Sequence, residues 1–392
     1  MSDSTSIKRV LNHNNWPAVD LFDCERELLA QMAKHNIQQI FSTAKLEANE
    51  NDEEFNAVVG YILDGLDSLP RRPDAAFDCL YRAIDRNLCQ FSNSGSPFMH
   101  NLVDEFFRKH HNEWTTITHI LTEHIPQQTA DYAAYRILDC HIDSNPPHTD
   151  KMKLRAGRSL GSVRYKEFCE KHLIENPQIP GGFFDIEYQQ RRNAGRLMRH
   201  LFRRTTPLIP RAGVVSCIST VLDLSNPVNL LSPEEKLKSL LEILIATYRH
   251  ERFHGQTFTP FRSSKASLKT YAHAYYTLMV TYIIILGILH HLGKGGLSIT
   301  SIIDAAQKNM DNLKSFFGDA KAYADLSNPS PVNLRLAAMK PLFDGSANLY
   351  IRAEYAKDII ESAKFAKEAG VKKVVIVGGD ESYKVASYLK EN

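Results

Sequence analysis

The sequence contains little cysteine, and its thiols form no recognisable framework. The chain has 392 residues and six cysteines, none of them in a C-x-x-C pair: Cys24, Cys79, Cys89, Cys140, Cys169 and Cys217. Small secreted domains need closely spaced disulfides, and structural zinc sites need paired Cys or His ligands, so the spacing favours neither class. Scattered thiols are typical of a reducing compartment. We therefore expect a cytoplasmic protein that needs no metal or cofactor.

The sequence also lacks a clear membrane-directing segment. Its first residues, MSDSTSIKRVLNHNNW, are polar and have no apolar core of the kind found in signal peptides. Residues 275–289, YYTLMVTYIIILGIL, are strongly apolar but fall short of the roughly 18 to 20 residues that a membrane span requires. We expect a fully buried core helix here and no membrane partner.

Neither sign of charge dominates the chain, because 47 Lys and Arg residues nearly balance 45 Asp and Glu residues. An electrostatic partner must therefore be sought in local clusters. Residues 151–204 form a basic stretch with interleaved aromatic residues. This composition suits a phosphate backbone with stackable bases and predicts RNA binding; a set of solvated helix faces is the alternative. The candidate RNA-binding residues are Lys151, Lys153, Arg155, Arg158, Arg191, Arg192, Arg196 and Arg199.

Hydrophobic periodicity predicts a mainly α-helical protein. Residues 73–88 place apolar side chains at helical spacing behind a proline suited to a first turn, and the residues around Phe106 continue the pattern. The length of the chain favours more than one domain. We predict a helical N-terminal region over residues 1–150, a helical domain with the basic stretch over 151–310, and a small α/β segment over 311–392.

A helix that begins near residue 232 is clearly marked. Ser232 offers an N-cap hydroxyl, Pro233 takes the first helical position and Glu235 the third, which is the pattern of a capping box. An apolar stripe then runs to Tyr248, and Gly255 stands at a position suited to a C′ residue. The last turn of this helix therefore carries the sequence ATYRHERFHGQ, residues 246–256.

Arg249, His250 and His254 in this last turn have side chains suited to phosphodiester chemistry. Arginine keeps its charge and can neutralise a phosphate whose negative charge grows in the transition state. Histidine can take a proton from a ribose 2′-hydroxyl or give one to a 5′-oxygen leaving group. The alternative is a helix cap, because cations near a helix C-terminus contribute roughly 0.3 to 1 kcal/mol each. Five positions along a straight helix rotate side chains by about 140°, so Arg249 and His254 converge only if the helix ends there or a second protomer completes the site.

This arrangement resembles the R-x4-6-H motif of HEPN-domain ribonucleases, since four residues separate Arg249 from His254 and a second long apolar helix follows a short polar loop. The resemblance implies a helical bundle that forms a homodimer, in which two motifs face each other. It implies Arg249 and His254 as catalytic residues and His250 as the polar residue that orients the site. The implied reaction is metal-independent cleavage of single-stranded RNA or tRNA by 2′-hydroxyl attack, which leaves a 2′,3′-cyclic phosphate.

The same resemblance extends to the expected biology. Such nucleases commonly act as toxins or antiviral effectors, so control by a regulatory protein or a nucleotide signal is expected. The competing hypothesis is a non-catalytic helical module that binds RNA or a protein in a defence or regulatory complex, with the motif acting only as a helix cap.

The C-terminal segment has a different pattern, in which strand and helix alternate as in a parallel βαβα unit. From about residue 312 it resembles part of the imidazolonepropionase-like amidohydrolases, whose metal-dependent barrels contain such units. Arg352 and the pair Gly378-Gly379 stand where metal-binding histidines would follow the strands, and two βα units cannot close an eight-stranded barrel. We therefore expect no hydrolase activity from this segment. Such a small unit should pack on the helical body, pair with a second copy or be poorly ordered.

Overall fold

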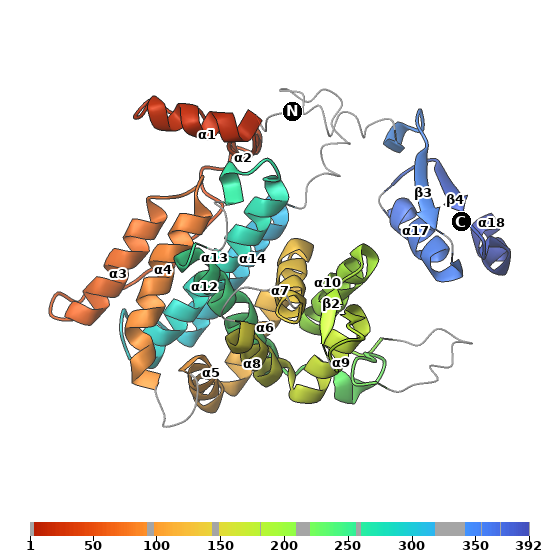
Figure 1. The fold of residues 1–392 in the computed structure, drawn as a ribbon. Helices are drawn as coiled ribbons and strands as arrows, with labels where there is room; N and C mark the ends of the chain where they lie inside the picture. The colour runs from red at the N-terminus through yellow and green to blue at the C-terminus, as the bar shows by residue number, and fades with distance from the viewer. Residues whose placement is uncertain are drawn as a thin grey trace. The chain divides into compact units, whose positions relative to one another are not determined.

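Helices make up most of the part of the chain that the structure describes. The structure is a computed structural model that describes residues 4–91, 98–142, 149–180, 182–208, 220–255, 260–317, 342–353, 355–368 and 370–391. The chain divides into two units, Met1–Lys314 and Ser315–Asn392. The described part of the first unit is helical with one short hairpin, whereas the second combines two strands with helices (Figure 1). The predicted mainly α class with a small α/β segment is confirmed.

The first unit begins with a series of helices. Their bounds are α1 (Ser4–Asn14), α2 (Asp23–Lys34), α3 (Glu53–Leu66), α4 (Pro73–Leu88), η1 (Cys89–Phe91), α5 (Phe98–Lys109), α6 (His111–Glu123), α7 (Gln127–Asp139), α8 (Thr149–Leu160) and α9 (Ser162–His172). The helix predicted at residues 73–88 is confirmed as α4, whose apolar face is buried. The predicted domain boundary at residue 150 falls within this unit, in which α4 packs against the distant helix α13 (Leu268–His291).

The unit continues with a short hairpin and the helices that carry the motif. Their bounds are β1 (Ile174–Glu175), β2 (Phe183–Asp185), α10 (Tyr188–Arg203), η2 (Pro227–Asn229), α11 (Pro233–Ser239), η3 (Leu240–Ile245), α12 (Ala246–Phe253), η4 (Pro260–Arg262), α13 and α14 (Ile299–Phe317). Strands β1 and β2 pair antiparallel. The sequence pattern does not predict this hairpin, because strands of two or three residues are too short to show an alternation of apolar and polar residues.

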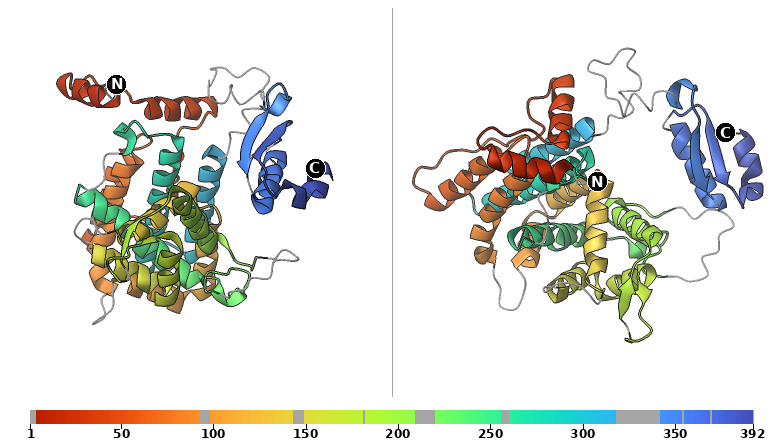
Figure 2. Two further views of the ribbon diagram at one scale, coloured as in Figure 1. Left: turned by 45° about the vertical axis from the view of Figure 1, so that its right-hand side comes forward. Right: turned by 45° about the horizontal axis from the view of Figure 1, so that its top comes forward.

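Helix α13 lies in the core of the first unit. All its residues from Tyr271 to Leu289 are buried, and so is 94% of its most apolar 18-residue window, although its length and hydropathy would allow a membrane span. A Cβ atom at Gly287 would lie 2.7 Å from the Trp114 ring, so glycine is what lets the helix approach the indole. Trp114 in turn stacks on Phe106, with ring centroids 4.0 Å apart. The predicted buried core helix is confirmed, and Figures 1 and 2 show α13 inside the unit.

The motif helix is a continuous run of α11, η3 and α12. The Ser232 hydroxyl accepts a hydrogen bond from Glu235 N at 3.1 Å, and Ser232 N donates to the Glu235 carboxylate at 2.7 Å, which confirms the predicted capping box. The middle segment η3 is a π-helix, and all its residues are buried, including Glu242. A π-helix turns more widely than an α-helix. The faces of α12 are therefore rotated relative to those of α11, which regular helical spacing does not predict.

The second unit has the predicted βαβα order. Its elements are β3 (Leu349–Ala353), α17 (Ala356–Glu368), β4 (Val374–Gly378), η5 (Ser382–Val385) and α18 (Ala386–Glu391). Strands β3 and β4 pair in parallel, with Leu349 opposite Val374. Ala353, Ile359 and Val385 form a small core between sheet and helices. Residues 318–341 belong to the segment that resembles amidohydrolases and precede β3. They lie outside the described residues.

Candidate functional site

The motif lies where helix α12 ends. Phe253 is its last residue, His254 is the C-cap, and Gly255 has a φ of +65°, which glycine adopts readily. The predicted C′ glycine is confirmed. His254 is exposed and His250 is half-buried. The side chains of Arg249 and His254 can converge only if the helix ends at the motif or a second protomer completes the site. The first of these conditions is met, because the helix ends before His254.

His250 and His254 lie against each other at this helix end. Their ring centroids are 4.4 Å apart and their planes are inclined by 51°. Residues four positions apart share one side of a helix, which explains why the backbone brings them together. Two imidazoles in contact are chemically suited to proton transfer, in which one ring can exchange a proton and the other can orient it.

Arg249 extends towards α4. Its Nη2 atom lies 3.3 Å from Asp85 Oδ2, and its guanidinium carbon lies 5.5 Å from the centre of the Tyr81 ring and 4.9 Å from that of Phe253. The Arg249 side chain is 32% exposed and that of Asp85 is 41% exposed. Burial raises the pKa of Asp85, and Arg249 only partly opposes this shift. Ion pairs of such exposure contribute about 0 to 1 kcal/mol, so Asp85 holds Arg249 weakly.

Arg252, the second arginine of the motif, is bound far more tightly. Its Nε and Nη2 atoms donate to the two carboxylate oxygens of Asp78 at 2.7 and 2.6 Å. Its Nη1 atom lies 3.2 Å from Asp74, which is fully buried and is also bound by Arg72. Burial raises the pKa of Asp74, but the hydrogen bonds from Arg72 and the charge of Arg252 outweigh this and lower it below the usual value. Arg252 therefore joins α12 to α4.

A buried polar network behind the motif was not identified from the sequence. Tyr132 donates from its hydroxyl to Glu251 Oε2 at 2.8 Å, and Arg136 Nε lies 2.9 Å from Glu251 Oε1. Burial raises the pKa of Glu251, and Arg136 and Tyr132 oppose this shift. The His273 ring of α13 lies 5.0 Å from that of Tyr132 and 5.5 Å from that of Tyr248. One feature of the sequence pointed to this network: Glu251 is the single acid among the basic residues of the motif. A Glu that is buried requires a polar partner.

The basic residues of α8 differ in their surroundings. Lys151 is exposed, whereas Lys153, Arg155 and Arg158 are half-buried. Arg158 Nη2 donates to Glu242 Oε2 at 2.8 Å. Burial raises the pKa of Glu242, but hydrogen bonds from His100 and Arg158 outweigh this and lower it. Arg158 thus has a structural partner on the motif helix.

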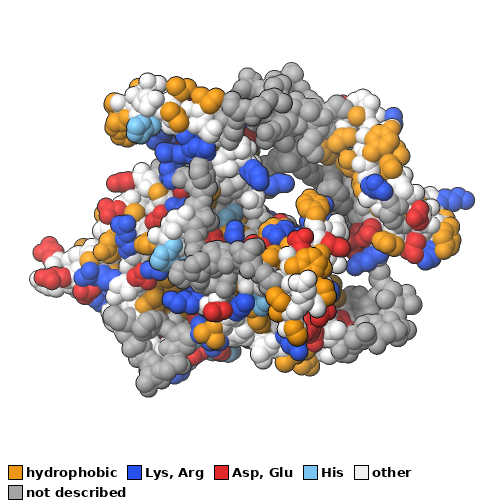
Figure 3. Space-filling view, viewed as in Figure 1, with side chains coloured by type: hydrophobic (Ala, Val, Ile, Leu, Met, Phe, Trp, Pro, Cys, Tyr) orange, Lys and Arg blue, Asp and Glu red, His pale blue; other side chains and the backbone are white. Residues whose placement is uncertain are grey.

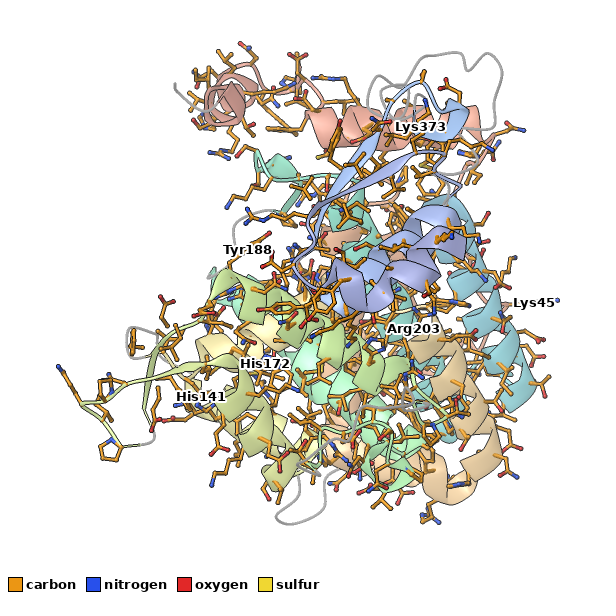
Figure 4. The ribbon with its side chains drawn as sticks, turned by 90° about the vertical axis from the view of Figure 1, so that its right-hand side faces the viewer. Lys45, His141, His172, Tyr188, Arg203 and Lys373 are labelled. Atoms are coloured by element: carbon orange, nitrogen blue, oxygen red, sulfur yellow. The ribbon has the colours of Figure 1, made fainter. Side chains whose placement is uncertain are left out.

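The basic residues of α10 likewise include some that bind other parts of the protein and some that are exposed. This helix runs from Tyr188 to Arg203 (Figure 4). Arg191 donates to Asp139 at 3.1 Å, and Arg199 donates to the carbonyl of Ile125 at 3.3 Å. On the face shown in Figure 3, cationic and anionic side chains are interspersed. The members of the predicted set that remain exposed are Lys151, Arg192 and Arg196.

No protein-family model, curated protein or solved structure matches this chain. Within the described ranges, no group of three or more His, Cys, Asp or Glu residues is placed to hold a metal ion. What the protein does must therefore be inferred from its own side chains and their contacts.

Proposed function

We propose that this protein is a metal-independent endoribonuclease with a HEPN-type helical bundle, which cleaves single-stranded RNA or tRNA. Arg249 and His254 are its catalytic residues, and His250 orients the site. The observation that carries this proposal is the placement of the three side chains at one helix end: the two imidazoles are in contact, His254 is exposed, and Arg249 is held only weakly by Asp85.

The proposed reaction needs only these groups and the substrate. The ribose 2′-oxygen forms a bond to the adjacent phosphorus, and the bond from phosphorus to the 5′-oxygen breaks. His254 takes the proton of the 2′-hydroxyl, and the leaving 5′-oxygen gains a proton from an imidazole or from water. Arg249 neutralises the phosphate oxygens as their charge grows. The products are a 2′,3′-cyclic phosphate and a 5′-hydroxyl.

A homodimer fits this site, because the motif lies at a helix end where a second copy can present its own motif. The exposed cations Lys151, Arg192 and Arg196 are the candidates for contacts with the rest of the RNA. A nuclease of this kind would serve as a toxin or antiviral effector under the control of a regulatory protein or nucleotide signal.

A non-catalytic module that binds RNA or a protein is the second candidate. In this candidate the basic residues at the end of α12 serve only the fold, as Arg252 does by joining α12 to α4. A module of this kind would bind RNA without cutting it.

Cleavage of an RNA oligonucleotide and of its 2′-deoxy counterpart distinguishes the two candidates. The proposal expects wild type to cut the RNA only, because the 2′-hydroxyl is the nucleophile. His254→Ala should remove cleavage, while His13→Ala, at an exposed histidine of α1, should not. Equal cutting of both substrates, or full activity of His254→Ala, would overturn the proposal, and RNA binding without any cleavage by wild type would favour the module.

A further inference from the structure

Helix α10 presents a basic face to solvent. Its 16 residues include five arginines and one histidine but no acid. Met198 and Leu201 are buried on its inner side, whereas Arg192, Arg196 and Arg203 are exposed. An α-helix turns by about 100° per residue, so positions 196 and 203 lie within about 40° of position 192. These three residues therefore form an arginine stripe along the helix, roughly 16 Å long at a rise of about 1.5 Å per residue.

Tyr188, the first residue of α10, lies at the start of the arginine stripe and is 75% exposed. The guanidinium carbon of Arg192 lies 5.9 Å from the centre of the Tyr188 ring, within the range of a cation–π contact. Figure 4 labels Tyr188 and Arg203, the first and last residues of the helix. The ring is thus in contact with the stripe and still has most of its surface exposed.

The other two arginines of α10 are bound within the fold. Arg191 donates to Asp139 at 3.1 Å and lies over the Tyr135 ring, 4.8 Å from its centre. Arg199 donates to the carbonyl of Ile125 at 3.3 Å. Among the residues that the structure describes, the arginines of the stripe form no hydrogen bond or ion pair. Contacts within the fold therefore do not explain their presence.

One acid of a neighbouring helix lies against α10. Helix α7 packs on α10, and a Cβ atom at Gly195 would lie 1.9 Å from Asp131 Oδ1. Burial raises the pKa of Asp131, and the charges of Arg192 and Arg196 oppose this shift. Asp131 is thus shared by two arginines of the stripe, while Arg203 lies about 10 Å further along the helix than Arg196.

The remaining acids near α10 form no ion pair with the stripe. Glu187, which precedes the helix, is exposed. Helices α6 and α9 also contact α10, and in the described ranges none of their acids pairs with an arginine of α10: Glu113, Glu123, Glu167 and Glu170. Acids of the surrounding elements therefore weaken the positive charge of this face without binding its arginines.

A row of cations that begins with an exposed aromatic ring suits a single nucleic-acid strand. Proteins that bind such strands combine cations along the backbone with aromatic side chains on which bases stack. An acidic protein would make no use of the exposed ring, and insertion into a membrane surface would need apolar side chains beside the cations. The other exposed residues of α10 are all polar: Gln189, Arg192, Arg196, His200 and Arg203.

We propose that this face of α10 binds single-stranded RNA, with Tyr188 stacked on one unpaired base and the arginine stripe bound to phosphates of neighbouring nucleotides. This inference rests on the proposed function, in which RNA is the substrate, and deepens it by naming the residue that selects an unpaired base. The set of RNA-binding residues expected from the sequence contains neither Tyr188 nor Arg203.

The test is the affinity for an RNA oligonucleotide whose riboses carry 2′-O-methyl groups, which prevent cleavage by 2′-oxygen attack. Affinity is measured over a range of salt concentrations for the single strand and for the duplex that it forms with its complement. The variants are Tyr188→Ala, Tyr188→Phe and Arg196→Gln. Their matched controls are Tyr355→Ala and Lys45→Gln, at an exposed tyrosine and an exposed lysine outside α10. Thermal unfolding checks folding, and every variant should keep the wild-type Tm because the substituted side chains are exposed.

We expect Tyr188→Ala to weaken binding of the single strand about five- to hundredfold, the effect of losing one stacked base. The slope of log affinity against log salt should stay unchanged, because stacking is not an ionic contact, and Tyr188→Phe should bind as wild type does. Arg196→Gln should lower this slope by about 0.7, the value for one phosphate contact on a single strand. Duplex binding should not depend on Tyr188, since paired bases already stack on each other. Both controls should bind as wild type does.

Several results would overturn the inference. These are wild-type affinity of Tyr188→Ala for the single strand, equal losses in Tyr188→Ala and Tyr355→Ala, equal losses on single strand and duplex, and an unchanged salt slope in Arg196→Gln. A wild-type protein that binds no single-stranded RNA would overturn it as well.

The outcomes also separate this inference from the proposed function. Cleavage of unmodified RNA that does not depend on Tyr188 would uphold the nuclease and overturn the binding face. Binding that depends on Tyr188 and Arg196, in a protein that never cleaves RNA, would support the binding face and overturn the nuclease.

Discussion

Arg252 and Asp78 join the motif helix to α4 through two hydrogen bonds of 2.7 and 2.6 Å. Arg249, three residues earlier on α12, makes one contact of 3.3 Å with the partly exposed Asp85. The two arginines of the motif therefore differ in what holds them. Arg252 is bound by two carboxylates of α4, whereas Arg249 has one weaker ion pair.

The first prediction separates these roles by stability. Arg252→Ala leaves the fully buried carboxylate of Asp74 with one cation fewer and should lower the free energy of unfolding by about 3 to 5 kcal/mol. Arg249→Ala should lower it by no more than about 1 kcal/mol. Urea unfolding measures both. Similar losses in the two variants would contradict the assignment of Arg252 as the structural arginine.

The second prediction concerns acid stability and the buried His273. Burial lowers the pKa of His273 from 6.5 to about 4, so the folded protein keeps it neutral where the unfolded chain takes up a proton. The unfolded state thus binds more protons between these values, and the free energy of unfolding falls as the pH drops from about 6.5 to about 4. His273→Leu should make the loss between pH 7 and pH 5 smaller by about 2 kcal/mol.

Urea unfolding of wild type and His273→Leu at several pH values checks this difference. The free energy of unfolding should still fall with pH in both proteins, because burial also lowers the pKa of His141 and His172 to about 4. Both residues are labelled in Figure 4. Parallel pH profiles for the two proteins would show that His273 titrates normally in the folded state.

The third prediction concerns the close approach of α13 to Trp114. A Cβ atom at Gly287 would lie 2.7 Å from the Trp114 ring and 2.8 Å from that of Phe106. Gly287→Ala should therefore lower the free energy of unfolding by about 1 to 3 kcal/mol through overpacking. Gly60→Ala in α3 is the matched control, because a Cβ there meets no atom within 4 Å. The control should be neutral or stabilising by up to about 1 kcal/mol, and equal effects at the two positions would contradict the packing described.

Local signals in the sequence predicted several elements of the fold. The Ser232 and Glu235 capping box, the left-handed Gly255 and the buried helix around residues 275–289 are confirmed, because each depends on neighbouring residues or on a long apolar run. The alternation of strand and helix likewise predicted the second unit. The π-helix η3 was missed, because leucine and isoleucine in a row fit an α-helix equally well.

The site was predictable only where its partners are close in sequence. The spacing of His250 and His254 places their rings together within one helix. The separation of roles between Arg249 and Arg252 was not predictable, because Asp78 lies 174 positions from Arg252. The contact between Glu251 and Tyr132 was not predictable either, because the two residues are 119 positions apart in the sequence. Several cations of the basic stretch also proved to have structural partners that sequence spacing does not show.

The chemistry of the product ends tests the proposed ribonuclease activity directly. End-labelled single-stranded RNA is incubated in excess EDTA with wild type, Arg249→Ala and His254→Ala. If the protein is the proposed nuclease, wild type should give fragments with 2′,3′-cyclic phosphate and 5′-hydroxyl ends, and each variant should lose about a hundredfold or more in rate. Products with 5′-phosphate ends, or unchanged rates in both variants, would contradict it.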